Sequence, residues 1–167
     1  VEAPTRFIMR ALDADAKDDR AAWDVVMQLA VRQPDPEVLF ATARALATSA
    51  GIRAPLSLWH AAELLAPLTD AERHAPEVAA RAHAWRGQLY FAVQRPIAAR
   101  EEFLAAAGID PSLGLPLLAW SGWLALDADP DTLRADRGAL ERWCATTDSA
   151  GATRTALHPH RGMEPQL

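Results

Sequence analysis

The segment between His83 and Pro111 has the residue spacing of two antiparallel helices that pack closely against each other. A small residue is required where the two backbones approach, and a large side chain one turn later fills the adjacent seam. Asp110-Pro111 then ends the second helix and caps a following one. The residues at these positions are Gly87, Tyr90, Ala99, Phe103, Ala106 and Pro111. The spacing therefore predicts a helical hairpin.

These offsets resemble the tetratricopeptide repeat, a helix–turn–helix unit of about 34 residues. Part of the pattern recurs 44 positions later: Trp59, Ala62 and Pro67 correspond to Phe103, Ala106 and Pro111. An insertion of about ten residues around 70–79 accounts for the longer spacing. Pro55 departs from the pattern, because it stands where the later unit has the small residue Ala99.

The resemblance implies one helical domain at 1–147, with a loose repeat at 36–67, the best repeat at 76–111, and a degenerate repeat or cap at 113–146. Such units stack as antiparallel hairpins into a short right-handed array, so we expect an all-α fold of about eight to nine helices. An ordinary helical bundle, whose alanine-rich helices match a permissive pattern, is the alternative. The polar segment 148–167 is expected to be a tail.

Composition favours helix along most of the chain, because alanine and leucine dominate and β-branched residues are scarce. Prolines and glycines divide the sequence into segments. Helices are expected at 6–12, 19–32, 36–50, 55–66, 70–74, 76–93, 96–108, 112–126 and 130–145. The acidic stretch 13–19 is interpreted as a loop, and a capping box at 69–72 is expected to begin the short helical turn.

Two of these segments show a buried stripe at helical spacing. In the second the stripe contains Trp23, Val26, Met27 and Ala30. In the third it contains Leu39, Thr42, Ala43, Leu46 and Ala50.

Aspartate and proline start the third helix. Asp35 can accept hydrogen bonds from the first free backbone N–H groups, and Pro36 takes the first position.

The charge pattern argues against a nucleic-acid partner and the hydropathy against a membrane span. The formal net charge is -5, and the sixteen arginines and single lysine are interleaved with carboxylates, so no basic face is expected. The longest uncharged run, 111–126, is shorter than the roughly 20 residues that span a bilayer. Cys144 is the only cysteine, which excludes an intramolecular disulfide and fits a reducing cytoplasm.

No catalytic, metal or cofactor motif emerges from the remaining polar residues. His60, His74 and His83 fall on three different expected elements, and His158 and His160 are two apart in the tail without further ligands. Cys144, Ser57 and Ser121 lack the neighbours of an activated nucleophile, and the adjacent pairs Glu101-Glu102 and Asp18-Asp19 do not share a helix face. We therefore expect a non-catalytic protein without a cofactor.

The favoured function is a protein-interaction module. In stacked repeats the first helix of each unit lines a concave surface. On the helix expected at 76–93, this geometry predicts a partner groove containing Arg81, Gln88 and Phe91. Arginine can pair with a carboxylate, glutamine can bond a peptide backbone, and phenylalanine supplies an apolar contact. The alternative is that these side chains pack against a neighbouring helix.

The helix expected at 112–126 predicts a second surface, for self-association. Its circumference is apolar, with Trp120 and Trp123 three residues apart, and one following helix can cover only part of it. The sequence favours a two-fold homodimer centred on this helix and Trp123 over a monomer. In the alternative, the tail folds back over the helix, or the two tryptophans form a core shared with the last helix.

A second resemblance covers more of the chain. The residues that carry it are Leu58-Trp59, the segment 79–85, Ile97-Ala98-Ala99, the segment 109–112 and Leu117-Leu118. Together they are similar to the C-terminal helical part of an uncharacterised actinobacterial protein family, with which the arginine-rich, lysine-poor composition agrees. Members of that family carry an additional N-terminal region. With a start at Val1, this suggests an alternative function, a helical accessory or dimerisation domain of a larger enzyme.

Overall fold

In the computed structural model, residues 3–32, 35–49, 54–122 and 138 are described, and this part of the chain is helical without any strand. The predicted all-α class is therefore confirmed for these residues. The elements are α1 (Pro4–Lys17), α2 (Arg20–Arg32), α3 (Pro36–Ser49), α4 (Ala54–Leu64), the 3-10 helix η2 (Ala66–Thr69), α5 (Pro76–Ala92), α6 (Pro96–Ile109) and α7 (Pro111–Gly122). The helix expected at 130–145 and the tail at 148–167 lie outside the described residues, apart from position 138.

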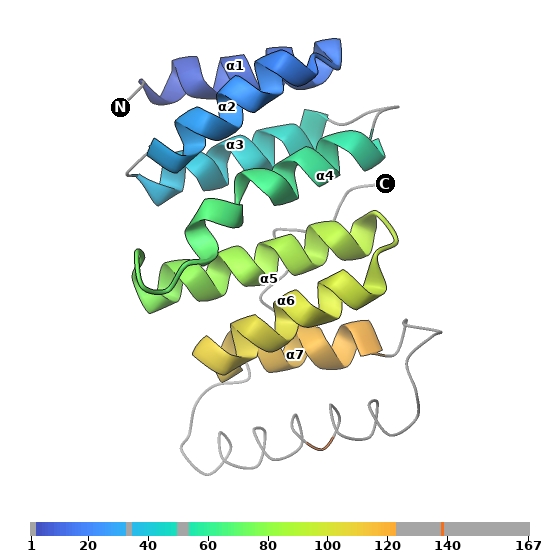
Figure 1. The fold of residues 1–167 in the computed structure, drawn as a ribbon. Coiled ribbons are helices and arrows are strands. Elements are labelled where there is room, and N and C mark those ends of the chain that lie inside the picture. The colour runs from blue at the N-terminus through green and yellow to red at the C-terminus, as the bar shows by residue number, and fades with distance from the viewer. Residues whose placement is uncertain (1–2, 33–34, 50–53, 123–137, 139–167) are drawn as a thin grey trace.

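The helices form an elongated stack in which successive helices run in opposite directions (Figure 1). α1 packs against both α2 and α3, and α3 packs against α4. α5 contacts α4, η2, α6 and α7, and α6 also contacts α7. From α4 onward each α-helix thus packs against the α-helix before it, while contacts such as α1 with α3 and α5 with α7 join elements two places apart.

Prolines and aspartates mark the helix starts, as the sequence predicts. Asp35 Oδ1 accepts a hydrogen bond from the backbone N–H of Glu37 at 2.9 Å, and Pro36 begins α3. Asp110 Oδ1 likewise accepts from the N–H of Ser112 at 2.9 Å at the start of α7. Each carboxylate satisfies a donor that has no partner within its own helix, which fixes where the helix begins.

The first helix is longer than predicted, because the acidic stretch 13–19 is mostly helical. α1 continues to Lys17 and ends where Asp18 takes the left-handed conformation, with φ at 54°. The predicted loop at 13–19 was therefore wrong, and two sets of contacts stabilise the helix there. Lys17 Nζ lies 2.7 Å from Oδ2 of Asp13 one turn away, a pair that supports an exposed helix face. Asp15 is buried, with partners on α4.

The connection between α4 and α5 also differs from the prediction. The 3-10 helix occupies Ala66–Thr69, which was not predicted, whereas 70–74 forms the expected single turn, closed by a hydrogen bond from the His74 N–H to the Asp70 carbonyl at 3.0 Å. Thr69 does not act as the cap, since its hydroxyl donates to the carbonyl of Ala66 at 2.8 Å. Asp70 performs this role and accepts from the N–H of Glu72 at 2.9 Å. Pro67 has no backbone N–H to donate, and α4 ends before it, as the sequence predicts.

Two hydrophobic cores fill the stack. The first lies among α1, α2, α3, α4 and the start of α5, and the second among α4, α5, α6 and α7. Leu89 packs against both. The predicted stripes are confirmed, since Trp23, Val26 and Ala30 of α2 and Leu39, Thr42, Ala43 and Leu46 of α3 are buried. Met27 is partly buried against the first core, and Ala50 lies outside the described residues.

The close approach predicted for the hairpin occurs between α5 and α6. A Cβ atom added to Gly87 would lie 2.4 Å from Cε1 of Phe103 and 3.1 Å from the carbonyl oxygen of Ala99. Only glycine fits there, so Gly87 sets the distance between the two helices. Gly114 has the same role between α6 and α7, because its Cβ would lie 2.1 Å from the backbone nitrogen of Ala107.

Candidate functional site

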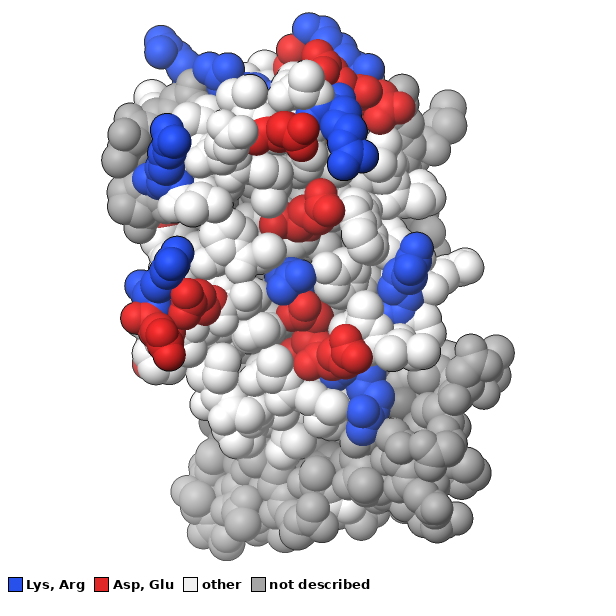
Figure 2. Space-filling model, in the orientation of Figure 1, with Lys and Arg blue, Asp and Glu red and all other residues white. Residues whose placement is uncertain are grey.

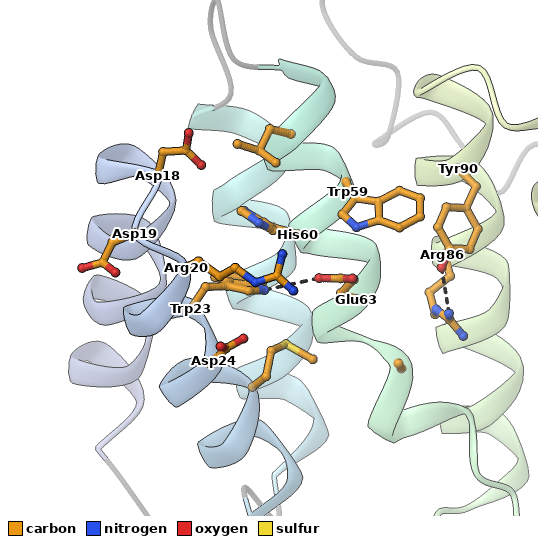
Figure 3. A pocket seen from close by; sticks show the side chains of 13 residues that line it. Asp18, Asp19, Arg20, Trp23, Asp24, Trp59, His60, Glu63, Arg86 and Tyr90 are labelled. Carbon is orange, nitrogen blue, oxygen red and sulfur yellow. Dashed lines mark hydrogen bonds between the residues drawn. The ribbon is translucent and has the colours of Figure 1, made fainter.

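A cavity of about 620 Å³ opens between α2, α4 and α5, and we call it the α2–α4–α5 cavity. Asp18 and Asp19, which connect α1 to α2, and the first residue of η2 complete its walls (Figure 3). Its walls are aromatic at Trp23, Trp59 and Tyr90, and its volume is within the range of small-molecule and side-chain binding sites. Three helices that are far apart in sequence therefore create one recess.

Asp15 anchors the wall that α1 and α4 share. Ser57 Oγ donates a hydrogen bond to Oδ2 of Asp15 at 2.6 Å, and Nδ1 of His60 lies 2.7 Å from Oδ1. Because a carboxylate only accepts hydrogen bonds, the imidazole Nδ1–H is the donor in the second contact. Both carboxylate oxygens are thus occupied, and His60 is held in one orientation beside the cavity.

Trp23 covers this histidine from α2. The rings of Trp23 and His60 are stacked, with centroids 4.1 Å apart and an interplanar angle of 23°. Trp23 Nε1 donates to Oε2 of Glu63 at 3.3 Å (Figure 3). The indole therefore joins α2 to α4 through an apolar face and a polar edge, as buried tryptophans commonly do.

The opposite wall combines α4 with α5. The rings of Trp59 and Tyr90 are tilted by 50°, with centroids 5.5 Å apart. Arg86 donates from Nη2 to the Tyr90 hydroxyl at 2.9 Å and from Nε to the carbonyl of Ala62 at 3.1 Å. Arg95 places its guanidinium carbon 5.7 Å from the centroid of the Trp59 ring, and it is not among the residues that line the cavity.

A partly buried ion network behind this wall connects α5 to α6. Oε1 of Glu102 forms an ion pair with Nη1 of Arg86 at 2.9 Å. Its other oxygen, Oε2, lies 2.7 Å from Nδ1 of His83. Together with its contacts to Tyr90 and Ala62, the Arg86 guanidinium therefore uses each of its three nitrogens in the protein. The network orients Arg86 and leaves its charge balanced.

These groups do not form the arrangement of a nucleophilic or metal-dependent enzyme. The Ser57 hydroxyl donates to Asp15, so it is not hydrogen-bonded to the imidazole that would activate it. His60 and His83 each pair with a different carboxylate. Within the described part of the chain, no group of three metal-ligating side chains comes together. Chemically, the arrangement is suited to binding through charge and aromatic surface.

The rim of the cavity is mainly acidic. Asp18, Asp19, Asp24 and Glu63 line it, together with the arginines Arg20 and Arg86. The charge of Arg86 is paired with Glu102. On the face seen in Figure 2, acidic and basic side chains are interspersed and neither sign forms one continuous patch. In the lining of the cavity, four carboxylates outnumber two arginines.

The residues predicted for a partner groove lie elsewhere. Arg81 donates to both carboxylate oxygens of Glu37 on α3, and its guanidinium carbon is 3.8 Å from the centroid of the Phe40 ring. Phe91 packs against the second core, and Gln88 is partly buried. None of the three lines the α2–α4–α5 cavity. The structure uses Arg81 to join two helices, and the assignment of a partner groove to Arg81, Gln88 and Phe91 stays a prediction.

The predicted self-association surface is only partly within the described residues. Trp120 belongs to α7, and Trp123 lies outside them. The homodimer centred on these two residues therefore stays a prediction.

Sequence reasoning missed the cavity itself. The sequence predicts Trp23 in a buried stripe and Tyr90 in the seam of the hairpin, and it suggests Ser57 and His60 only as catalytic or metal-binding candidates. The spacing of Leu56, Trp59, His60 and Glu63 on one helix face was the available signal. Nothing in the sequence indicated that α2 and α5 would flank that face.

A scan against protein-family models, a search of curated proteins and a search of solved structures each found no match to this chain. The resemblances to tetratricopeptide repeats and to the actinobacterial family therefore stay predictions from the residues that carry them. Among the described helices, none combines the length and apolar character needed to cross a bilayer.

Proposed function

We propose that this chain is a non-catalytic helical-repeat interaction module, which holds an extended segment of a partner protein in the α2–α4–α5 cavity. The cavity is the observation that carries the proposal. Its volume of about 620 Å³ accommodates one or two side chains, and its aromatic walls resemble the anchor pockets of protein interfaces.

The repeat character of the fold supports this function. We propose that the hairpins stack as a short tetratricopeptide-like right-handed array, with α3–α4 and α5–α6 as successive units. The buried small residues Ala62 and Ala106 occupy corresponding positions, and Gly87 allows the close approach that such a hairpin requires. Arrays of this kind bind extended segments along surfaces created between neighbouring units.

The contacts around the cavity also favour a preformed binding site. His60, Trp23 and Arg86 are held by hydrogen bonds to residues of other helices or by ring stacking, so little ordering is needed when a ligand enters. Preorganisation of this kind reduces the entropic cost of association.

A random peptide library displayed on phage and panned on the whole chain tests the function. Enriched peptides are synthesised and titrated against the wild type, Trp59→Ala and Trp85→Ala. Both substitutions remove one partly buried tryptophan, but only Trp59 lines the cavity. We expect Trp59→Ala to weaken binding by about tenfold or more, as for an aromatic anchor, and Trp85→Ala to change it by less than about threefold.

Hydrogen exchange of the wild-type complex supplies a readout that does not depend on how either variant folds. Slower exchange in 20–32 and 54–64 on peptide binding is expected. A panning experiment that enriches no peptide, or protection confined to other helices, would contradict the proposed function.

A further inference from the structure

We infer that the α2–α4–α5 cavity accepts the lysine or arginine side chain of a bound peptide, with its cationic group between the acidic rim and the Trp59 ring. This inference rests on the proposed function and adds the chemical class of the ligand. The recess, its aromatic walls and its uncompensated negative charge are separate observations that point to the same occupant.

The charge balance of the lining is the first step. Glu63 belongs to α4 and Asp24 to α2, and the two carboxylates line the cavity from different walls. Glu63 accepts only the weak donor Trp23 Nε1, at 3.3 Å, and Asp24 forms no ion pair within the described residues. A ligand cation placed between them is attracted by two carboxylates. The site is partly enclosed, so solvent and salt screen this attraction less than on an open surface.

The basic residues of the lining do not cancel this charge. Arg86 uses three of its five N–H groups on Glu102, Tyr90 and the carbonyl of Ala62, and its charge is paired with Glu102. Arg20 is the other lining arginine, and it shares the lining with four carboxylates. An anionic ligand would therefore meet more repulsion than attraction.

The aromatic wall supplies the second element of recognition. A guanidinium or ammonium group is attracted to the face of an indole ring. Arg95 already approaches Trp59 in this way, and it does so without lining the cavity. Arg81 on Phe40 and Arg86 on Tyr90 repeat the arrangement within the chain. Cation–π contacts thus already occur within this fold. The cavity is lined by the Trp59 ring, which is available for such a contact with a ligand.

Size distinguishes a peptide side chain from a free inorganic cation. A volume of about 620 Å³ holds the aliphatic stem and the charged head of a long basic side chain together with adjacent backbone. Leu56 and Met27 provide apolar lining for the stem. Lysine and arginine bury such stems along apolar surface while the head group finds a charged partner.

Three synthetic peptide libraries that are identical except for one central residue test the ligand class. The fixed residue is arginine, glutamine or glutamate, and each library is titrated against the whole chain by fluorescence anisotropy. We expect the arginine library to bind at least about fivefold more tightly than the glutamine library, and the glutamate library to bind most weakly. Higher salt should reduce the difference between the libraries.

Charge-removing variants then locate the effect. Glu63→Gln keeps an oxygen acceptor for Trp23, and Asp24→Asn keeps the side-chain shape, so the double variant removes charge with little change of packing. It should lower the affinity of the arginine library by about tenfold and leave the glutamine library nearly unchanged. Glu101→Gln, an exposed change on α6 away from the cavity, is the matched control and should leave both affinities unchanged.

Equal affinities for the three libraries, or an arginine preference that survives the double variant, overturn the cation site. If peptides of another charge bind and protect α2 and α4 from hydrogen exchange, the interaction function stands and only the ligand class fails. If no peptide binds at all, both proposals fail.

Discussion

The hydroxyl of Ser57 donates a 2.6 Å hydrogen bond to the carboxylate of Asp15, across 42 residues of sequence. Both side chains are buried, and the second oxygen of Asp15 is occupied by His60. A buried carboxylate is stable only when its oxygens have partners. The contact therefore fixes α1 to α4 and positions the histidine beside the cavity.

We expect Asp15→Asn to lower the free energy of unfolding by about 1–3 kcal/mol, because the amide cannot satisfy both donors as the carboxylate does. Urea denaturation of the whole chain measures this. Asp13→Asn, an exposed position on the same helix, should change the free energy by less than about 0.5 kcal/mol. Equal effects at the two positions would show that the buried contact does not stabilise the fold.

Gly87→Ala should destabilise the chain by about 1–3 kcal/mol, since the new Cβ would overlap the Phe103 ring at 2.4 Å. Thermal or urea unfolding provides the measurement. Gly108→Ala on α6 is the matched control, because a Cβ there meets nothing within 4 Å. It should be neutral or stabilising by up to about 1 kcal/mol through helix propensity.

A second-site change tests the cause of that loss. Phe103→Leu creates space opposite position 87, so the double variant should lose less stability than the sum of the two single losses. If the two losses in the free energy of unfolding simply add, the effect of Gly87→Ala does not come from its contact with Phe103.

Arg86→Met should cost about 2–4 kcal/mol, because Glu102 would lose its guanidinium while partly buried. Arg86→Met combined with Glu102→Met should cost less than the two single changes together, since neither charge is left alone. Arg73→Met removes an exposed ion pair with Asp70 and should cost less than about 0.5 kcal/mol. Chemical denaturation of the four variants gives the comparison.

The contact between Arg81 and Glu37 predicts a pH dependence. The hydrogen bond from Arg81 lowers the pKa of the Glu37 carboxyl below its ordinary value of 4.5. Because the folded state holds the lower pKa, the stabilisation is present above about pH 4.5 and is lost as the pH falls through the folded value. Both side chains are partly exposed, so the contribution stays within about 1 kcal/mol.

Urea unfolding of the wild type and Glu37→Gln at several pH values measures this contribution. The stability difference between them should be largest near neutral pH and shrink as the pH falls below about 4. Glu77→Gln is the control, because Glu77 also lies in the first turn of its helix. A difference that grows on acidification would contradict the assigned direction.

Several local features could be predicted from the sequence because their causes are local. Asp35 and Asp110 each cap the following helix by accepting from a backbone N–H two residues away, and Gly87 faces Phe103 within one hairpin. In each case the interacting residues are separated by one turn or one short connection. Spacing alone therefore specifies the contact.

The cavity and its anchoring contacts required the tertiary structure. The acidic stretch that contains Asp15 predicts a loop, because the partners that bury this side chain, Ser57 and His60, are 42 and 45 residues away. Trp23 and Glu63 are likewise joined across 40 residues. Sequence spacing within one helix states which side chains share a face, but not which other helix will cover that face. The amino-acid sequence by itself thus determined most of the helices, the caps at Asp35 and Asp110 and the α5–α6 hairpin. Only the packing of α1, α2 and α5 around α4 decided where charge and aromatic surface meet.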